Sequence, residues 1–349
     1  MEQLPRLGKI NYEFFSRVVY PSLGAKDASV IVGPQNGVDF GVVELGPGQV
    51  MVLSTDPFYI AKELGIERAA WFAVHIIASD VAVSGIAPKY LSIDLNLPPG
   101  ITEGELTRLW KAVSDECVKL KIAVVTGHTA RYAGCNYPMV GGATMIGIGK
   151  RKDLIAPKAN PGDAIIITKG PAIEATGLMA AYFPKYLEKK FGKAFVKEAQ
   201  GIFFKMSTVK DALITAKTGG ATAMHDATEC GIFGGLYEIA THSQVGLELD
   251  LEKIIFPEVV KKTCGCFGLD PYKSISEGTL LATAKMSKAN AIISALETEG
   301  IEACVAGKIV EKRKGMRVFS DGGKESELKH PGTDPFWAKF EEYLKKNAG

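Results

Sequence analysis

The sequence predicts an α+β protein built from two domains. Its 349 residues exceed what one ordinary hydrophobic core accommodates, so two domains of under about two hundred residues each are expected. Short β-branched segments alternate with helical patterns in both halves of the chain. Between the halves, "RKDLIAPKANPGDAIIITKG" combines two prolines and a Pro-Gly turn before a new strand. We therefore place the boundary near residue 155, with domains at 1–155 and 156–349.

The first half is expected to form a mixed sheet with two helices. Apolar runs bounded by Gly, Pro or Asp predict strands at residues 29–33, 40–45, 49–56, 89–97, 122–127 and 142–149. One helix is expected over residues 69–88, where many alanines allow close packing on a sheet. A second, amphipathic helix is expected over residues 102–121, with an apolar stripe formed by Leu106, Leu109, Trp110, Val113, Cys117 and Leu120.

The second half repeats the alternation. We expect a strand at residues 164–170, a long helical region over 174–218, and a glycine-rich loop at 225–235 that opens a helix over 236–243. Strands at 278–284 and 303–310 flank a helix over 288–300. The residues 337–349 form a short amphipathic helix.

Composition narrows the classes of function. A net charge of +2 gives no electrostatic case for nucleic acid or for an anionic membrane surface. The apolar stretch 69–88 carries His75, Ser79 and Asp80, so a buried helix is expected there and not a membrane span. Six scattered cysteines and the absence of a signal-like segment indicate a reducing, cytoplasmic protein. Cys264 and Cys266 make half a zinc site at best, and buried or loop thiols are the favoured interpretation.

Three acids occupy apolar surroundings. Asp56 ends an expected strand, Asp80 lies within the apolar helix, and Asp226 introduces the glycine-rich loop. Each alone could cap a helix or form a turn. Together they demand a shared cation, since an unpaired buried carboxylate is costly. Mg²⁺ carrying a nucleotide triphosphate meets that demand with dispersed carboxylates.

Two loops add to this site. The stretch "TECGIFGGLYEIA" provides backbone N–H groups at a helix start, which can bind phosphate, although the chain contains no P-loop. In "VVTGHTARY", we expect His128 in a tight loop at the carboxyl end of a strand. A neutral imidazole there can hydrogen-bond or bind a metal, and a plain hydrogen-bonded loop residue is the alternative.

Several motifs, in order and at their separations, resemble one family. They are "VLSTDPFYI", "IIASDVAVSGIAPKYLSIDL", "IAVVTGHT", "IIITKGPAIEATGLMA", "MHDATECGIFGGLYEIA" and "SEGTLLAT". The chain resembles the AIR synthase-related superfamily over nearly its whole length. That superfamily includes aminoimidazole ribonucleotide synthase, selenophosphate synthetase, thiamine monophosphate kinase and HypE-type hydrogenase maturation factors. "SDVAVSGIAPKYLS" and "DATECGIFGGLYEIA" are most similar to the HypE-type branch.

The resemblance implies an N-terminal mixed-sheet domain that dimerises through its strands into a barrel, a C-terminal α/β sandwich domain, and ATP with Mg²⁺ in the groove between them. It assigns metal binding to Asp39, Asp56 and Asp80, and catalytic roles to Asp80, His128, Lys169 and Asp226. The resemblance also implies nucleotide or substrate contacts for eight residues: Asp39, Asp56, Ser79, Gly127, Thr129, Glu174, Thr228 and Glu229. Val38 and His128 replace family acids, so one metal ion is expected. Cys230 replaces a family glycine, and its role as nucleophile or as a tolerated small residue stays open.

The resemblance implies an ATP-dependent enzyme that activates an amide-like or phosphate-accepting oxygen by phosphoryl transfer, including a role in hydrogenase maturation. The alternatives are a nucleotide-binding maturation or assembly partner without turnover, and a small-molecule kinase or cyclo-ligase. HypE-type factors carry a Pro-Arg-Ile-Cys tail, whereas the sequence here has no cysteine after Cys304. We therefore expect the acceptor on a small molecule or on another protein, such as a maturation partner.

Overall fold

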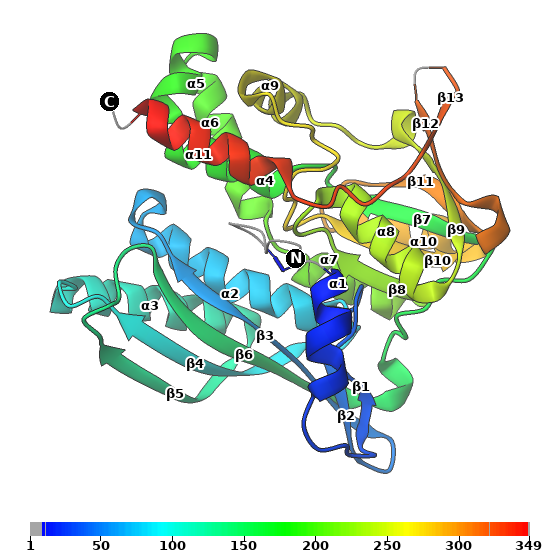
Figure 1. Ribbon diagram of the computed structural model, residues 1–349, viewed down its shortest axis with the longest axis horizontal. Coiled ribbons are helices and arrows are strands. Elements are labelled where there is room, and N and C mark those ends of the chain that lie inside the picture. Colours follow the sequence, from blue (N-terminus) through cyan, green and yellow to red (C-terminus); the bar gives the residue numbers. More distant parts are fainter. Residues whose placement is uncertain (1–8, 11, 321, 348–349) are drawn as a thin grey trace.

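The computed structural model describes residues 9–10, 12–320 and 322–347, and it contains two sheets with helices packed against them (Figure 1). The strands of the first sheet lie between residues 30 and 150, and those of the second between residues 163 and 327. The proposed domain boundary near residue 155 therefore falls in the connection between the two sheets. Within the described ranges, none of the helices has the length and apolarity needed to span a membrane.

The first sheet has the strand order β1-β2-β3-β6-β4-β5. Strands β4 and β5 are parallel and are connected by helix α3, whereas all other neighbouring strands are antiparallel. The expected mixed sheet is therefore confirmed. Its strands are β1 (Val30–Val32), β2 (Gly41–Gly46), β3 (Gln49–Ile60), β4 (Pro88–Leu97), β5 (Ala123–Arg131) and β6 (Met139–Lys150), and its helices are α1 (Tyr12–Phe14), α2 (Ile66–Ala82) and α3 (Glu103–Leu120).

Helix α2 lies between the first sheet and the second half of the molecule (Figure 1). Its alanines are almost completely buried, which allows the close packing predicted from the sequence. The helix ends at Ala82, earlier than the expected residue 88. Gly85, with a φ of 83°, makes a turn there and Pro88 starts β4, so the last residues of the apolar stretch leave the helix.

Strand β5 runs through the segment expected to be a loop. His128 pairs with Asp94 in the parallel ladder, which continues as far as Leu97 and Arg131. The expectation of a tight loop at His128 is therefore wrong, because β4 supplies a long parallel partner that keeps the backbone extended. The strand lies at the sheet edge and is exposed along almost its whole length.

The second sheet has the order β13-β12-β9-β11-β7-β10-β8, with β9 and β12 parallel and the other neighbours antiparallel. Its strands are β7 (Asp163–Thr168), β8 (Ala221–Asp226), β9 (Gly246–Asp250), β10 (Leu280–Lys285), β11 (Ala303–Val310), β12 (Met316–Ser320) and β13 (Lys324–Glu327). The helices are α4 (Ile173–Tyr182), α5 (Pro184–Phe191), α6 (Lys193–Gly201), α7 (Val209–Thr218), α8 (Gly231–Ser243), α9 (Glu258–Phe267), α10 (Met286–Thr298) and α11 (Pro335–Asn347).

Both faces of the second sheet are covered, so the expected α/β sandwich is confirmed. Every residue of the central strand β7 is buried. Ile165 and Ile167 belong to the core beneath α8, whereas Ala164 and Ile166 belong to the core beneath α10, as alternation along a strand requires. The expected long helical region over 174–218 is divided, because Pro184 starts α5 and Gly192, with a φ of 85°, ends it.

The two halves are joined by hydrogen bonds from α2 to the segment before α7. The N–H of Thr208 donates to the hydroxyl of Ser79 over 3.0 Å, and Nδ1 of His75 lies 2.8 Å from the hydroxyl of Ser207. Burial lowers the pKa of His75 to about 4, so this imidazole is neutral at physiological pH. These contacts hold α2, and with it Asp80, against the second half.

Candidate functional site

Acids from distant parts of the chain meet where the two halves join. Asp39 follows β1, Asp56 lies in β3, Asp80 lies near the end of α2, and Asp226 ends β8. The hydroxyl of Ser54 donates a 2.8 Å hydrogen bond to Oδ2 of Asp80. Burial first, and then the charges of the other three acids, raise the pKa of Asp80 well above its usual value. The structure therefore brings together the acids that the sequence predicted; we call this group the acid cluster.

Asp56 lies inside β3 and not at the end of a strand, as the sequence suggested. The strand continues through Pro57 to Ile60. Beyond Leu53, β3 pairs with β6 but no longer with β2. Pro57, which has no N–H, is tolerated because one edge of β3 has no neighbouring strand there. Burial raises the pKa of Asp56 above its usual value, against the opposing charge of Lys9.

Glu277 and Glu174 border the cluster and have raised proton affinities. The N–H of Glu277 donates to Oε2 of Glu174 over 3.1 Å. Burial, followed by the charges of Asp226 and Glu174, raises the pKa of Glu277 well above its usual value. Burial also raises the pKa of Glu174 to about 8. The sequence analysis missed Glu277, although the quoted motif "SEGTLLAT" contains it.

The carboxylate oxygens of two of these groups accept no regular hydrogen bond from the described residues. Asp226 and Glu277 are fully or almost fully buried, and among the described residues none makes a regular hydrogen bond to their carboxylate oxygens. Burial would raise the pKa of Asp226, but the nearby imidazole of His225 lowers it below its usual value. A buried carboxylate whose oxygens accept no regular hydrogen bond fits a divalent cation, since Mg²⁺ binds through oxygen ligands.

His225 lies between carboxylates of both domains. Its Nε2 is 2.8 Å from Oε2 of Glu238 on α8, and its Nδ1 is 3.0 Å from Oδ2 of Asp39 and 3.8 Å from Oδ1 of Asp226. Burial would lower the pKa of His225, but these carboxylates raise it well above its usual value. The sequence analysis did not select His225, although its position beside Asp226 in "MHDAT" offered the signal.

Gly37 places Asp39 beside this histidine. Its φ is 75°, and a Cβ at this position would lie 2.8 Å from the carbonyl oxygen of Glu238. Only glycine allows the loop after β1 to approach α8 this closely. The loop thus carries Asp39 across the junction between the domains. Burial raises the pKa of Asp39 to about 6, although the charge of His225 opposes this shift.

Lys9 brings a positive charge to the cluster. Its backbone N–H donates to Oε2 of Glu229 over 2.9 Å, and its Nζ donates to Oγ1 of Thr228 over 3.1 Å. Lys9 is an exposed residue, yet the charges of several acids act on its ammonium group. Desolvation would lower the pKa of Lys9, but the charges of Glu238 and Asp56 raise it above its usual value. The sequence analysis missed this residue, which no local pattern distinguishes from other lysines.

The glycine-rich turn before α8 differs from the expected phosphate cradle. Cys230 and Gly231 have φ values of 63° and 57°. The N–H of Cys230 donates to Oδ2 of Asp334 over 2.6 Å, and that of Gly231 donates to the carbonyl of Thr228. The first donors of the helix are therefore already occupied. Burial raises the pKa of the Cys230 thiol to about 12, so this thiol is not an activated nucleophile.

Lys169 and Ser79 are also engaged within the protein. Nζ of Lys169 is buried, 2.8 Å from Oδ1 of Asp211 and 2.8 Å from the carbonyl of Ser207. The catalytic role expected for Lys169 therefore has no support from this geometry, because a buried carboxylate on α7 holds its ammonium group. The hydroxyl of Ser79 donates to the carbonyl of His75 and accepts from Thr208. Both residues position the segment that joins the domains.

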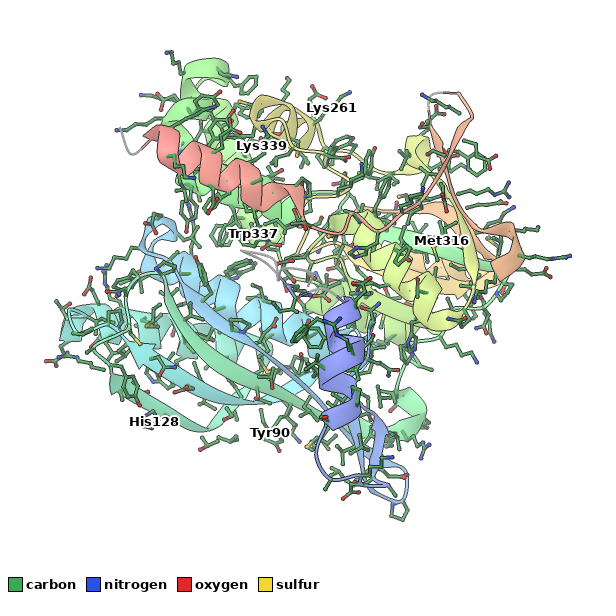
Figure 2. The ribbon with its side chains drawn as sticks, in the orientation of Figure 1. Tyr90, His128, Lys261, Met316, Trp337 and Lys339 are labelled. Carbon is green, nitrogen blue, oxygen red and sulfur yellow. The ribbon has the colours of Figure 1, made fainter. Side chains whose placement is uncertain are left out.

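Gly127, His128 and Thr129 are not part of the cluster within one chain. Nε2 of His128 lies 2.9 Å from the hydroxyl of Tyr132, and the labelled histidine sits at the outer strand of the first sheet (Figure 2). Together with Thr55 it lines a hollow on the open face of the sheet. Since neighbouring strand residues point to opposite faces, Asp56 points to the other side. The catalytic role expected for His128 therefore has no support from the geometry of a single chain.

Two family models cover most of the chain. Residues 37–149 match the AIR synthase related protein, N-terminal domain, and residues 160–319 match the AIR synthase related protein, C-terminal domain. The chain belongs to the AIR synthase related family. Membership of this family confirms the resemblance inferred from the sequence motifs.

Several of the similar proteins are named HypE. A carbamoyl dehydratase HypE from Rhizobium leguminosarum bv. viciae is 29% identical over 271 residues, covering 76% of this chain and 75% of the relative. A putative hydrogenase expression/formation protein from Methanocaldococcus jannaschii is 22% identical over 333 residues, covering 91% of this chain and 92% of the relative. The AIR synthase related chain thus aligns with these relatives over both of its domains.

Solved structures share the fold. A HypE–HypF complex gives a TM-score of 0.70 at 17% identity, with 91% of this chain and 99% of the other covered. HypE in complex with ATP gives a TM-score of 0.67 at 21% identity, with 94% of this chain and 97% of the other covered. AaThiL complexed with AMPPCP and TMP gives a TM-score of 0.66 at 22% identity, with 82% of this chain and 88% of the other covered. The fold class predicted from the sequence is therefore confirmed.

Proposed function

We propose that the protein is an ATP- and Mg²⁺-dependent enzyme of HypE type, which phosphorylates the oxygen of a carbamoyl or amide acceptor and then eliminates that oxygen as phosphate. The observation that carries the proposal is the acid cluster, in which buried carboxylates from both domains lie together and Asp226 has no hydrogen-bond partner among the described residues. The names of the relatives, carbamoyl dehydratase and hydrogenase expression/formation protein, favour this reaction.

Asp39, Asp56 and Asp80 would hold Mg²⁺. Bound Mg²⁺ neutralises charge on the transferred phosphoryl group and supports its in-line displacement. A shared cation also resolves the mutual repulsion that raises the pKa of Asp80. Ser54 orients this carboxylate by donating to Oδ2, which leaves the other oxygen for the metal.

Lys9 would contribute the second positive charge. Its Nζ already donates to Thr228, which lies at the turn before α8, and it faces the same acids. An ammonium there stabilises the charge of phosphate oxygens during transfer. Glu229, which accepts the N–H of Lys9, holds this residue in place.

Chemically, the acceptor oxygen forms a bond to the γ-phosphorus while the bond from that phosphorus to the β,γ-bridging oxygen breaks, and ADP leaves. One nitrogen proton is lost as the acceptor becomes a phosphorylated imidic acid. Its C–O bond then breaks, the second nitrogen proton is removed, and phosphate leaves with formation of a C≡N bond. Burial raises the pKa of Glu174 to about 8, and in its ionised form this carboxylate is a base strong enough to take a nitrogen proton. Beside it, burial raises the pKa of Glu277 well above its usual value, and the neutral form that this favours can protonate the departing phosphate.

We assign the acceptor to another molecule, either a small one or a group on a protein. Cys230 is the cysteine beside the site, and burial keeps its thiol protonated by raising its pKa to about 12. Cys264 is buried as well, and burial raises its pKa to about 12. A maturation protein that delivers a carbamoyl group is the favoured partner, and one solved structure with this fold is a HypE–HypF complex.

We also propose a homodimer formed through the first sheet. Strand β5 is an exposed edge with unpaired backbone groups, and Val124 and Val125 are exposed on it. Pairing with a second copy would bury this edge and the open face that carries His128. Sedimentation of the purified chain tests the association.

The reaction is tested by incubating the protein with ATP, Mg²⁺ and a carbamoylated thiol, and by measuring ADP, phosphate and the nitrile product. Acceptor-dependent release of ADP and phosphate with nitrile formation is expected. Loss of all three in the double variant Asp56→Asn, Asp80→Asn is expected too. A phosphorylated acceptor without nitrile would instead identify a kinase, and binding of ATP without turnover would identify an assembly partner.

A further inference from the structure

The segment that leads into α11 lies against the turn before α8. This turn comprises residues 228–230, and Lys9 is hydrogen-bonded to two of them. Asp334 immediately precedes α11, and Trp337 lies in the first turn of that helix (Figure 2). Each of these two side chains is hydrogen-bonded to a residue of the turn. The C-terminal helix thus meets the same element that holds Lys9.

The carboxylate of Asp334 holds the starts of two helices. Its Oδ2 accepts the N–H of Cys230 over 2.6 Å, and its Oδ1 accepts the N–H of Phe336 over 2.8 Å. The N–H groups at the start of a helix have no partner within that helix, so a carboxylate is a suitable cap. Cys230 also has a φ of 63°, which is unfavourable for a residue with a side chain and requires support from its surroundings. Asp334 provides that support and fixes the start of α8 relative to α11.

The carboxylate of Glu229 links Trp337 to Lys9. Its Oε1 accepts the Nε1–H of Trp337 over 3.3 Å, and its Oε2 accepts the backbone N–H of Lys9 over 2.9 Å. The indole has a single donor and no acceptor, so this contact uses its whole hydrogen-bonding capacity. Because both oxygens of Glu229 are engaged, the orientation of the carboxylate is fixed from the side of α11.

Aromatic packing fixes α11 and, with it, Trp337. The rings of Trp337 and Phe336 meet edge to face with centroids 5.3 Å apart, and Phe336 is fully buried. Phe340 stacks on Phe336 at 5.3 Å and meets Tyr182 of α4 edge to face at 4.8 Å. Such offset and edge-to-face arrangements are the favourable ones for aromatic pairs. The indole therefore approaches Glu229 from a helix that is anchored on α4.

Lys9 lies at the end of this chain of contacts. It is outside the described helices and strands, so its position depends on individual hydrogen bonds to the turn. Its Nζ donates to Oγ1 of Thr228 over 3.1 Å, and the charges of Glu238 and Asp56 act on it. A shift of the turn would therefore move the ammonium group relative to the acid cluster.

We propose that Trp337 and Asp334 are positioning residues for Lys9. Trp337 acts through Glu229, and Asp334 acts through Cys230. Together they keep the ammonium group of Lys9 at the acid cluster. This inference rests on the phosphate-binding role proposed above for Lys9, and it adds α11 as the element that keeps the ammonium in place. The alternative is that the same contacts only stabilise the packing of α11.

Labelling of amines in the full chain with acetic anhydride, without nucleotide, tests the positioning directly. Peptide mass spectrometry gives the rate at each lysine. Lys9 should react at least tenfold more slowly than the exposed Lys26, because carboxylates favour the protonated, unreactive amine. Trp337→Phe keeps an aromatic ring but removes the N–H donor, and it should accelerate labelling of Lys9 about threefold or more. Trp110→Phe, on the exposed side of α3, is the matched control and should leave the rate unchanged.

Calorimetric titration with ATP and Mg²⁺ separates the two interpretations. Trp337→Phe should weaken ATP binding about fivefold in the wild-type background. In the Lys9→Ala background the same substitution should change the affinity less than twofold, since a residue that acts through Lys9 has no effect once the ammonium is absent. Asp334→Asn should behave like Trp337→Phe in both measurements.

Two outcomes would overturn the positioning role. One is an unchanged labelling rate of Lys9 in Trp337→Phe, and the other is an equal loss of ATP affinity in both backgrounds. Either would leave Trp337 with a packing role alone. If Asp334→Asn fails to fold in thermal melts, the results for Trp337→Phe decide. No ATP binding by the wild-type chain, with the labelling as expected, would contradict the proposed function and retain the positioning of Lys9.

Discussion

The hydroxyl of Ser54 donates to Oδ2 of Asp80 over 2.8 Å, which joins β3 to α2 at the centre of the acid cluster. This bond holds one oxygen of a buried carboxylate whose pKa burial raises well above its usual value. Burial thus favours the neutral form of this carboxyl group, and a metal ion bound there would compete with its proton.

Asp80→Asn should separate stability from nucleotide binding. Asparagine resembles the protonated carboxyl group, so the free energy of unfolding without metal should change by less than about 1 kcal/mol. The affinity for ATP in Mg²⁺ should fall about a hundredfold, because a central carboxylate ligand is lost. Denaturant unfolding and ATP binding measure the two effects. Asp115→Asn on the exposed surface of α3 is the control and should change neither.

The metal-free protein should lose stability as the pH rises from about 5 to 8. Burial raises the folded-state pKa of Asp39 to about 6 and that of Glu174 to about 8, whereas unfolded carboxyl groups titrate near about 4. The folded state therefore binds more protons in this window, and its stability falls with increasing pH. Melting temperatures at several pH values test this, and Glu174→Gln should flatten the profile. A profile that rises through this window would contradict the assignment.

Lys9→Ala should weaken catalysis by removing the ammonium that faces the acid cluster. We expect a fall in kcat/KM for ATP of about tenfold or more, since a charge-assisted contact to phosphate is worth about 1.5 to 3 kcal/mol. Lys9→Arg should restore part of the activity. Steady-state kinetics give the result, with Lys26→Ala, an exposed lysine, as control. Unchanged kinetics in Lys9→Ala would assign Lys9 to a structural role.

Ser79→Ala should destabilise the junction of the domains. The substitution leaves the buried N–H of Thr208 without its acceptor, which costs about 1 to 3 kcal/mol. Equilibrium unfolding in urea measures the loss, and Ser114→Ala, exposed on α3, provides a matched control. An effect no larger than that of the control would show that this hydrogen bond adds nothing to the junction.

Local patterns predicted much of the fold. The amphipathic stripe of α3 and the capping pair of Thr102 and Glu105 are properties of adjacent residues, so helix and cap could be read from sequence. Strand β5 was misjudged at His128 because its extension depends on pairing with β4, which is a property of the tertiary structure. The same holds for Asp56, whose strand continues because β6 pairs with it.

The candidate site was predicted in part for a similar reason. Apolar surroundings identified Asp56, Asp80 and Asp226 as unusual acids, whereas Lys9 and His225 become functional candidates only through contacts with distant residues. A catalytic role was expected for Lys169 because the sequence does not show the buried Asp211 that holds it. Long-range pairing of charges is thus the main information that local patterns lack.

The central claim is a carboxylate, metal and phosphate site at the junction of the domains. Calorimetric titration of ATP into the wild-type protein, with and without Mg²⁺ and repeated on Asp80→Asn, tests it most directly. The account predicts binding that requires Mg²⁺ and is lost in the variant. Equal binding by the wild-type protein and Asp80→Asn, or no binding of ATP in any mixture, would contradict it.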